Sequence, residues 1–211
     1  MQVLLIRHGD PDYAHDTLTD KGHAEAKALA KHLRKTRIDD IYASPMGRAQ
    51  ATMSYTAKAH KLAPVTLPWL HELDGNFEGC LWAWNVPGAE VLASPELPGH
   101  DNWVQTVPYG PHMQGPHTAL ARNFDLLVQR YGYEREHHRY RVHGSTDKTV
   151  ALFCHAGVVM SLLSQLLTWP LPLVYSHLSC DTSSVSRLVW IEHDGYAVPR
   201  AKTINDLAHL K

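Results

Sequence analysis

Two histidines in this chain each follow a short apolar segment. His8 follows segment 2–6 through Arg7, and His155 follows segment 149–154 directly; in both cases a glycine comes within the next two positions. Each apolar segment has the length and composition of a strand buried in a parallel sheet. Ligands of such sheets bind outside the carboxyl ends of the strands. We therefore expect both imidazoles to face one crevice if the two strands are neighbours.

Two arginines add anion-binding groups to this expected crevice. Arg48 lies at the start of an expected helix that follows a strand at 39–43, and Arg7 lies at the end of the first strand. A helix N-terminus attracts anions through its free N–H groups and its dipole, and a guanidinium group adds two parallel donors. Together with two imidazoles, this donor set suits a dianion such as a phosphoryl group. The pattern predicts a phosphate-binding site.

The same residues could catalyse phosphoryl transfer. A neutral imidazole is nucleophilic near neutral pH, so one of the two histidines could form a covalent intermediate. The remaining cations would stabilise the oxygens of the transferring group. The leaving oxygen also needs an acid. Glu72 in the segment LHELDGNFEG is our candidate, Glu78 is the second choice, and Asp74 competes for the role.

Strands and helices alternate along most of the chain. The segment 134–148 is charged and is expected to form a loop, and the HDG turn between 184–192 and 196–203 is typical of a hairpin. The remaining elements follow from periodicity, apolar runs and the cap residue Thr19. Strands are expected at 2–6, 39–43, 65–67 and 149–154, and helices at 18–35, 46–61, 116–131 (with its proline near the first position) and 156–169.

This order of elements predicts an α/β fold. We expect a three-layer α/β/α sandwich whose central sheet is mostly parallel with an antiparallel edge strand. The length suits a single domain, residues 1–211, with an irregular insertion at about 80–115 that covers the substrate. The three tryptophans of that insertion, Trp82, Trp84 and Trp103, argue against disorder and favour lid or core packing.

Composition excludes several classes of protein. The formal net charge of -1 and the absence of a basic stripe argue against a nucleic-acid partner. No apolar run is long enough for a membrane span, and the N-terminus is charged too early for a signal peptide. Three scattered cysteines, Cys80, Cys154 and Cys180, indicate free thiols in a reducing cytoplasm.

Metal binding is the alternative reading of the histidine content. The chain has 16 histidines, and His137, His138 and His143 lie close together in sequence. Their spacing matches no common ligand pattern, so we expect a solvated segment there instead of a metal site.

Four motifs together resemble those of the histidine phosphatase superfamily, the phosphoglycerate-mutase-like group. Each is weak alone, but they occur in the family's order and on the expected elements. The resemblance covers 1–79 and 148–205. The motifs are Arg7-His8-Gly9, the S-P-x-x-R-A-x-x-T run 44–52, the acidic run 70–79, and His155-Ala156-Gly157.

The resemblance implies roles for individual residues. His8 would be the nucleophile that becomes phosphorylated, Glu72 would be the proton donor, and Arg7, Arg48 and His155 would bind the phosphate. No metal or organic cofactor is required in that family.

The sequence departs from the family pattern in two places. Asp10 and Pro11 follow the first motif, and the usual Asn or Thr that touches the phosphate is missing; Thr17 and Tyr13 are candidates to replace it. The run QGPHT stands where many members carry Gly-Glu-Ser, within the segment that shapes substrate choice. The substrate is thus less defined than the chemistry.

Three functions fit these observations. The first is a phosphatase that hydrolyses a small, partly apolar phosphorylated metabolite through phospho-His8. The second is a mutase on the same scaffold, for which the chain looks short. The third is a catalytically silent phosphate-binding module, against which the presence of both His8 and Glu72 argues. The sequence is also compatible with a homo-oligomer.

Overall fold

A central mixed sheet organises the molecule. The computed structural model describes residues 1–78, 81–107 and 109–211. Eight strands form the sheet in the order β5-β4-β10-β1-β11-β12-β9-β8. Their bounds are β1 Gln2–Arg7, β4 Asp40–Ala43, β5 Val65–Thr66, β8 Tyr133–Glu136, β9 Arg139–Val142, β10 Thr149–Cys154, β11 Val185–His193 and β12 Tyr196–Asp206.

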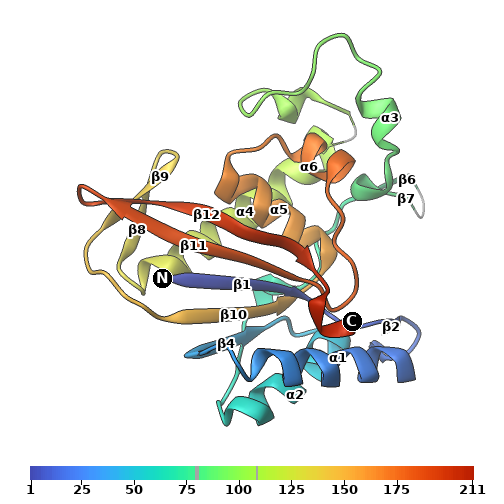
Figure 1. Cartoon of the computed structure of the whole chain (residues 1–211). Helices are drawn as coiled ribbons and strands as arrows, with labels where there is room; N and C mark the ends of the chain where they lie inside the picture. The colour runs from blue at the N-terminus through green and yellow to red at the C-terminus, as the bar shows by residue number, and fades with distance from the viewer. Residues whose placement is uncertain (79–80, 108) are drawn as a thin grey trace.

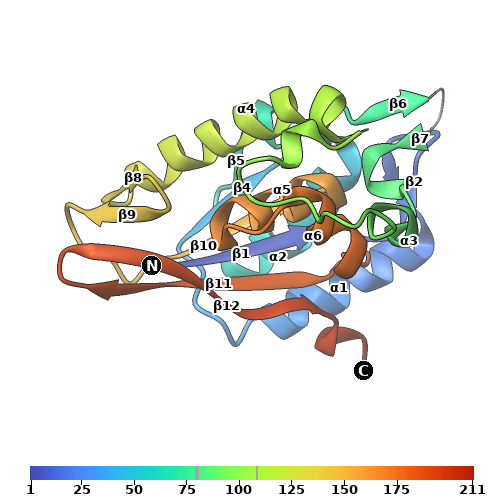
Figure 2. The same ribbon diagram turned by 90° about the horizontal axis from the view of Figure 1, so that it is seen from above.

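Helices cover both faces of this sheet (Figure 1). Helices α1 (Asp20–Leu33) and α2 (Gly47–His60) lie on one face, and α4 (Tyr109–Gln129) and α5 (Ala156–Leu167) lie on the other, with α6 (Leu171–His177) beside α5. Figure 2 shows the same layers from above. The predicted three-layer α/β/α sandwich is confirmed.

The alternation of β1 explains why the layers form. Leu4 and Ile6 belong to the core cluster under α1 and α2, whereas Val3 and Leu5 belong to the cluster under α4 and α5. Successive side chains of a strand point to opposite faces, so a strand that is apolar throughout must be covered on both sides. This arrangement buries the middle of β1 at the centre of the sheet and leaves its two end residues, Gln2 and Arg7, half-buried.

The antiparallel part of the sheet is larger than the expected edge strand. Strands β5, β4, β10 and β1 are parallel, but β1 pairs antiparallel with β11, and the remaining strands continue antiparallel. The β11–β12 hairpin turns at Asp194 and Gly195, both with positive φ, as its Asp-Gly pair predicts. The sheet is therefore parallel in the half that carries the predicted site.

The prediction of a loop at 134–148 is wrong, because β8 and β9 form a hairpin there. Tyr133 and Tyr140 are fully buried on its inner face, and Glu136 accepts hydrogen bonds from Arg139 and Arg141 on the outer face. The high charge density therefore marks the solvent face of a hairpin. The two buried tyrosines supply the apolar face that a strand requires.

The start of the third expected helix was also predicted wrongly. Helix α4 begins at Tyr109, and Pro116 lies inside it instead of near its first position. Proline favours the first turn of a helix but is tolerated further along where the helix is held by its neighbours. Tyr109 and Met113 in the preceding turns are fully buried, and this packing extends the helix upstream of the proline.

Shorter elements complete the chain. The predicted helices after Thr19, Met46 and His155 are present, and Thr19 accepts a hydrogen bond from the Gly22 amide as the expected N-cap. No helix of the described residues is long and apolar enough to cross a membrane. The remaining elements are β2 Pro11–Asp12, β3 Thr17–Leu18, η1 Pro68–Leu70, β6 Asn76–Glu78, β7 Leu81–Trp82, η2 Ala83–Asn85, α3 Gly88–Val91, η3 Trp103–Gln105 and η4 Ala208–Leu210.

Candidate active site

The sheet brings the two strand-end histidines together. Strands β1 and β10 are parallel neighbours, and their register sets Arg7 beside Cys154. Because the next residues are His8 and His155, both imidazoles leave the sheet at the same edge. Their ring centroids are 5.1 Å apart, and both side chains are buried. The predicted juxtaposition is present in the structure.

His8 is held with one ring nitrogen free to react. Its Nδ1 lies 2.8 Å from the carbonyl oxygen of Gly9, so Nδ1 carries the proton and donates it to that oxygen. Nε2 then keeps its lone pair and accepts a hydrogen bond from Arg48 Nε at 3.3 Å. Burial lowers the pKa of His8 to about 4, and the nearby Arg7 and Arg48 contribute to this decrease. The ring is therefore neutral near pH 7, which is the form a nucleophile needs.

His155 is also neutral and has an open hydrogen-bond position. Burial, with the neighbouring His8 and the arginines, lowers its pKa to about 2. Its Nε2 lies 2.7 Å from Ser44 Oγ at the end of β4, while its buried Nδ1 has no hydrogen-bond partner among the described residues. If Ser44 donates to Nε2, Nδ1 carries a proton that a substrate oxygen could accept. Ser44 is part of the sequence motif, but no role was predicted for it.

Arg48 is bonded to an acid that the sequence analysis did not single out. Asp16 Oδ1 accepts a hydrogen bond from Arg48 Nη1 at 2.6 Å, and Asp16 Oδ2 accepts one from the Gly47 amide at 2.7 Å. Burial alone would raise the pKa of Asp16, but the hydrogen bonds from Gly47 and Arg48 outweigh it and lower the pKa. The N-terminus of α2 thus already holds a carboxylate. The only signal for Asp16 in the sequence was its position next to Thr17, which was a candidate for the phosphate contact.

The two candidates to replace the missing phosphate contact, Tyr13 and Thr17, lie on either side of Asp16 in sequence. Tyr13 is exposed and lies with its ring 5.4 Å from the Arg48 guanidinium carbon, and Thr17 is in the short strand β3. Asp16, between them in sequence, is the residue of this loop that bonds Arg48.

Arg7 lies at the carboxyl end of β1 with part of its guanidinium group unpaired. Nη1 donates a hydrogen bond to the Cys180 carbonyl oxygen at 2.6 Å, which anchors the side chain. Nε is buried and has no hydrogen-bond partner among the described residues. An unpaired buried donor is costly, so an anion at this position would be bound favourably.

Glu72 is the acid that the fold places beside Gly157, two residues after His155. Its Oε2 accepts a hydrogen bond from the Gly157 amide at 3.3 Å, and its Oε1 accepts one from the Leu73 amide at 3.0 Å. Burial raises the pKa of Glu72, although the two amides, Arg48 and Arg7 act in the opposite direction. Asp74 is exposed, and the side chain of Glu78 lies outside the described residues.

The histidine-rich segment lies in the β8–β9 hairpin and the strand end that follows it. His143 lies 2.6 Å from Glu134, and His138 lies edge-on to His100. Within the described ranges, no group of three or more His, Cys, Asp or Glu side chains is arranged to hold a metal ion.

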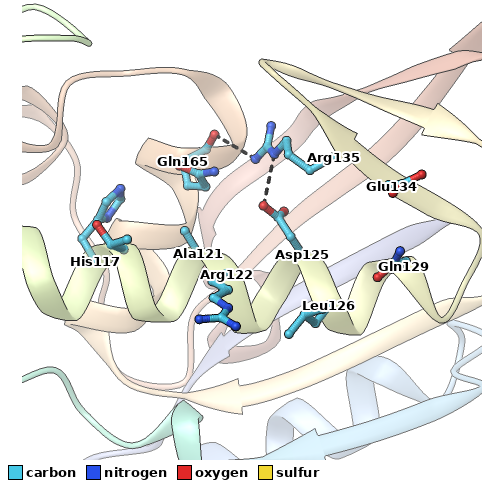
Figure 3. A pocket seen from close by; sticks show the side chains of 10 residues that line it. His117, Ala121, Arg122, Asp125, Leu126, Gln129, Glu134, Arg135 and Gln165 are labelled. Atoms are coloured by element: carbon cyan, nitrogen blue, oxygen red, sulfur yellow. Dashed lines mark hydrogen bonds and ion pairs between the residues drawn. The ribbon is translucent and has the colours of Figure 1, made fainter.

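A hollow of about 470 Å³ lies beside α4, with β8 and α5 contributing to its lining (Figure 3). Asp125 lies 3.3 Å from Arg135, and Arg135 also donates to the carbonyl oxygen of Gln165. These groups satisfy one another, and none of the candidate site residues lines the hollow. We therefore attribute this hollow to the packing of α4 against its neighbours and not to a binding site.

Comparison with known families agrees with the site geometry. The model of the histidine phosphatase superfamily (branch 1) matches residues 3–203. The chain belongs to the histidine phosphatase superfamily. The resemblance seen in the four motifs is thereby confirmed across nearly the whole chain.

Individual members of the superfamily are distant relatives. A protein of Schizosaccharomyces pombe named a probable phosphatase is 25% identical over 227 residues, which cover 100% of this chain and 96% of that protein. Phosphoserine phosphatase 1 of Hydrogenobacter thermophilus is 23% identical over 88% of this chain and 85% of its own.

Solved structures share the fold. A mycobacterial glucosyl-3-phosphoglycerate phosphatase in complex with inorganic phosphate superposes with a TM-score of 0.69 at 23% identity, covering 100% of this chain and 99% of that chain. Phosphoserine phosphatase of Entamoeba histolytica in complex with 3-phosphoglyceric acid gives a TM-score of 0.66 at 18% identity, with 100% and 99% covered.

Proposed function

We propose that this protein is a phosphatase that hydrolyses a small phosphomonoester through a phosphohistidine on His8. The observation that carries the proposal is that Nε2 of a neutral, buried His8 carries no proton and keeps its lone pair, which accepts a hydrogen bond from Arg48 Nε at 3.3 Å. The His8 ring centroid lies 5.1 Å from that of His155. The named phosphatases among the relatives support it.

The first step transfers the phosphoryl group to the protein. The Nε2 lone pair of His8 attacks phosphorus, the P–O bond to the alcohol breaks, and the proton of Glu72 moves to the leaving oxygen. Arg7, Arg48 and His155 bind the phosphoryl oxygens while charge develops on them. The raised pKa of Glu72 fits this acid role, because it keeps more of the group protonated.

The second step gives the phosphoryl group to water. The Glu72 carboxylate takes a proton from a water molecule, the water oxygen attacks phosphorus, and the N–P bond breaks. Inorganic phosphate leaves, and His8 and protonated Glu72 are restored. A mutase would return the phosphoryl group to an alcohol instead; a relative named a probable phosphoglycerate mutase matches only 35% of this chain.

The substrate we propose is a small, partly apolar phosphorylated metabolite. The small size is supported by a structural neighbour, a phosphoserine phosphatase, that has been crystallised with phosphoserine and with 3-phosphoglyceric acid. The apolar part is supported by Trp84, which lies beside the proposed proton donor. Cys154 and Cys180 are free thiols, which is typical of a reducing compartment, and we place the enzyme in the cytoplasm.

Phosphate release tests this function. The wild-type protein is incubated with p-nitrophenyl phosphate and with a panel of sugar and glycerate phosphates, with and without EDTA. We expect release of inorganic phosphate that EDTA does not change and that falls at least about a thousandfold in His8→Ala, because the nucleophile is lost. His193→Ala, at the exposed end of β11, is the matched control and should retain full activity.

Three outcomes would contradict the proposal. Phosphate release that survives in His8→Ala would exclude the phosphohistidine, and loss of activity in EDTA would indicate a metal mechanism. Isomerised glycerate phosphates without free phosphate would identify a mutase.

A further inference from the structure

The indole of Trp84 lies against the proton donor. A Cβ atom built on Gly157 would lie 2.6 Å from Glu72 Oε1 and 3.1 Å from Trp84 Cζ3, so the carboxylate and the indole crowd one position. A Cβ on Gly75 would lie 2.8 Å from the same Cζ3 atom. The six-membered ring of Trp84 therefore lies against two glycines, and a side chain at either one would crowd it.

Other aromatic rings hold Trp84 in this position. Trp82 stacks on it with ring centroids 5.2 Å apart and planes 13° apart, and Tyr175 lies 6.2 Å away on α6. Tyr175 is itself fixed, because its hydroxyl donates to the Gly157 carbonyl oxygen at 3.1 Å. The indole of Trp84 is thus held in place by the rings of Trp82 and Tyr175 and by the backbone at Gly75 and Gly157.

The cations around Glu72 favour its ionised form, so its role as a proton donor requires apolar surroundings. Two cations face it, and by themselves they would favour its ionised form, in which it has no proton to give. Burial acts against them and outweighs them, so the pKa of Glu72 is raised. The titratable groups that face Glu72 from the surrounding segments are Arg7 on β1, Arg48 on α2, Cys154 on β10, Tyr175 on α6, and Cys180 after α6.

We propose that Trp84 is a positioning residue of the reaction, whose indole excludes water from Glu72 and keeps the carboxyl group fixed beside Gly157. The inference rests on the proposed function of Glu72 as the proton donor. It assigns to the insertion a part in catalysis: one of its tryptophans forms a wall of the site.

Two substitutions of Trp84 test whether its apolar character, and not only its volume, affects Glu72. Trp84→Phe keeps an aromatic ring, and Trp84→Gln replaces it with a polar chain that brings water. We expect the pKa of Glu72, followed by ¹³C-carboxyl NMR and assigned with Glu72→Gln, to fall by about one unit in Trp84→Gln and to stay near the wild-type value in Trp84→Phe. Trp169→Phe, an exposed tryptophan after α5, is the matched control.

Kinetics with two leaving groups give the second readout. An alkyl phosphate such as β-glycerol phosphate needs a proton on its leaving oxygen, whereas p-nitrophenolate leaves without one. In Trp84→Gln we expect kcat/KM near pH 7 to fall about tenfold for the alkyl ester, with its alkaline limb moved to lower pH, and to change little for the aryl ester. Equal losses for both esters would indicate a purely structural role for Trp84.

The NMR readout separates this inference from the proposed function. An unchanged pKa of Glu72 in Trp84→Gln would overturn the inference even if the enzyme is a phosphatase. If the pKa falls as expected but the wild-type protein releases no phosphate from any ester, the wall around Glu72 stands and the proposed phosphatase function fails.

Discussion

At the scale of single residues, the unexpected feature of the site is that Arg48 is already paired. Asp16 holds Nη1 of Arg48 and the N-terminal amide of α2, the two groups that the sequence assigns to a substrate phosphate. Nε of Arg48 nevertheless remains directed at His8. A substrate phosphate must therefore share Arg48 with a carboxylate, which lowers the positive charge available to it.

Neutralising Asp16 tests this view. In Asp16→Asn the side chain keeps an oxygen for the Gly47 amide but loses its charge. We expect the inhibition constant of inorganic phosphate, measured against p-nitrophenyl phosphate, to fall about threefold, because a half-exposed charge contributes less than about 1 kcal/mol. Asp12→Asn is the control, since Asp12 bonds His15 and Ala14 instead of an arginine. A weaker affinity for phosphate in Asp16→Asn would show that Asp16 orients Arg48 for binding.

At the scale of elements, the β8–β9 hairpin is anchored to α4 by one buried acid. Asp125 on α4 accepts a hydrogen bond from Arg135 at 3.3 Å (Figure 3). It also accepts one from Tyr140 at 2.7 Å, and Arg135 lies over the Tyr140 ring. Both members of the ion pair are largely buried. Removing one partner leaves the other buried and uncompensated, which costs more than the pair itself contributes.

Substitution of Asp125 should therefore reduce stability without affecting catalysis. We expect Asp125→Ala to lower the free energy of unfolding by about 2 kcal/mol, measured by urea denaturation, with kcat of the folded protein unchanged. Glu136→Ala, which removes the exposed ion pairs of the same hairpin, should cost less than about 1 kcal/mol. A larger loss for Glu136→Ala than for Asp125→Ala would contradict this assignment.

The elements also show what the sequence could and could not predict. The ends of β1 and β10 were predictable because uninterrupted apolar strands must be buried in a sheet, so His8 and His155 had to emerge at one edge. Glu72 was predictable only with the help of the family motif. Asp16 was not, because its contact depends on a left-handed backbone conformation (φ 47°) in a short loop that carries no periodicity.

The β8–β9 hairpin was missed for a different reason. Its four-residue strands alternate, but their outward positions are all charged, and the inward Tyr140 falls within the segment 134–148 that was expected to form a loop. The burial of Tyr133 and Tyr140 depends on Trp190 of β11 and on α4, which are far away in sequence. Contacts of this kind are tertiary and leave little trace in a local pattern.

At the scale of the whole molecule, the two halves of the sheet have separate tasks. The parallel half ends in His8, Ser44 and His155 and carries the site, while the antiparallel half closes the core and supports α4. A further buried histidine lies outside the sheet, since His117 on α4 is buried against Trp103. Burying neutral histidines links the stability of the whole fold to pH.

Stability should decrease as the pH falls below about 6.5. Burial lowers the pKa of His8 to about 4, of His155 to about 2 and of His117 to about 4, so below the ordinary value of 6.5 the unfolded chain binds protons that the folded protein does not. The stability contributed by these three histidines is therefore complete above pH 6.5 and is lost as the pH falls toward 4, at about 1 kcal/mol per pH unit for each histidine.

Urea denaturation at pH 7, 6 and 5 measures this slope, and His117→Gln should reduce it by about one third without changing catalysis at pH 7. His15→Gln, at an exposed position, is the control. If the slope in His117→Gln equals that of the wild type, His117 is not held neutral by the fold, and the coupling must arise from the two histidines of the site alone.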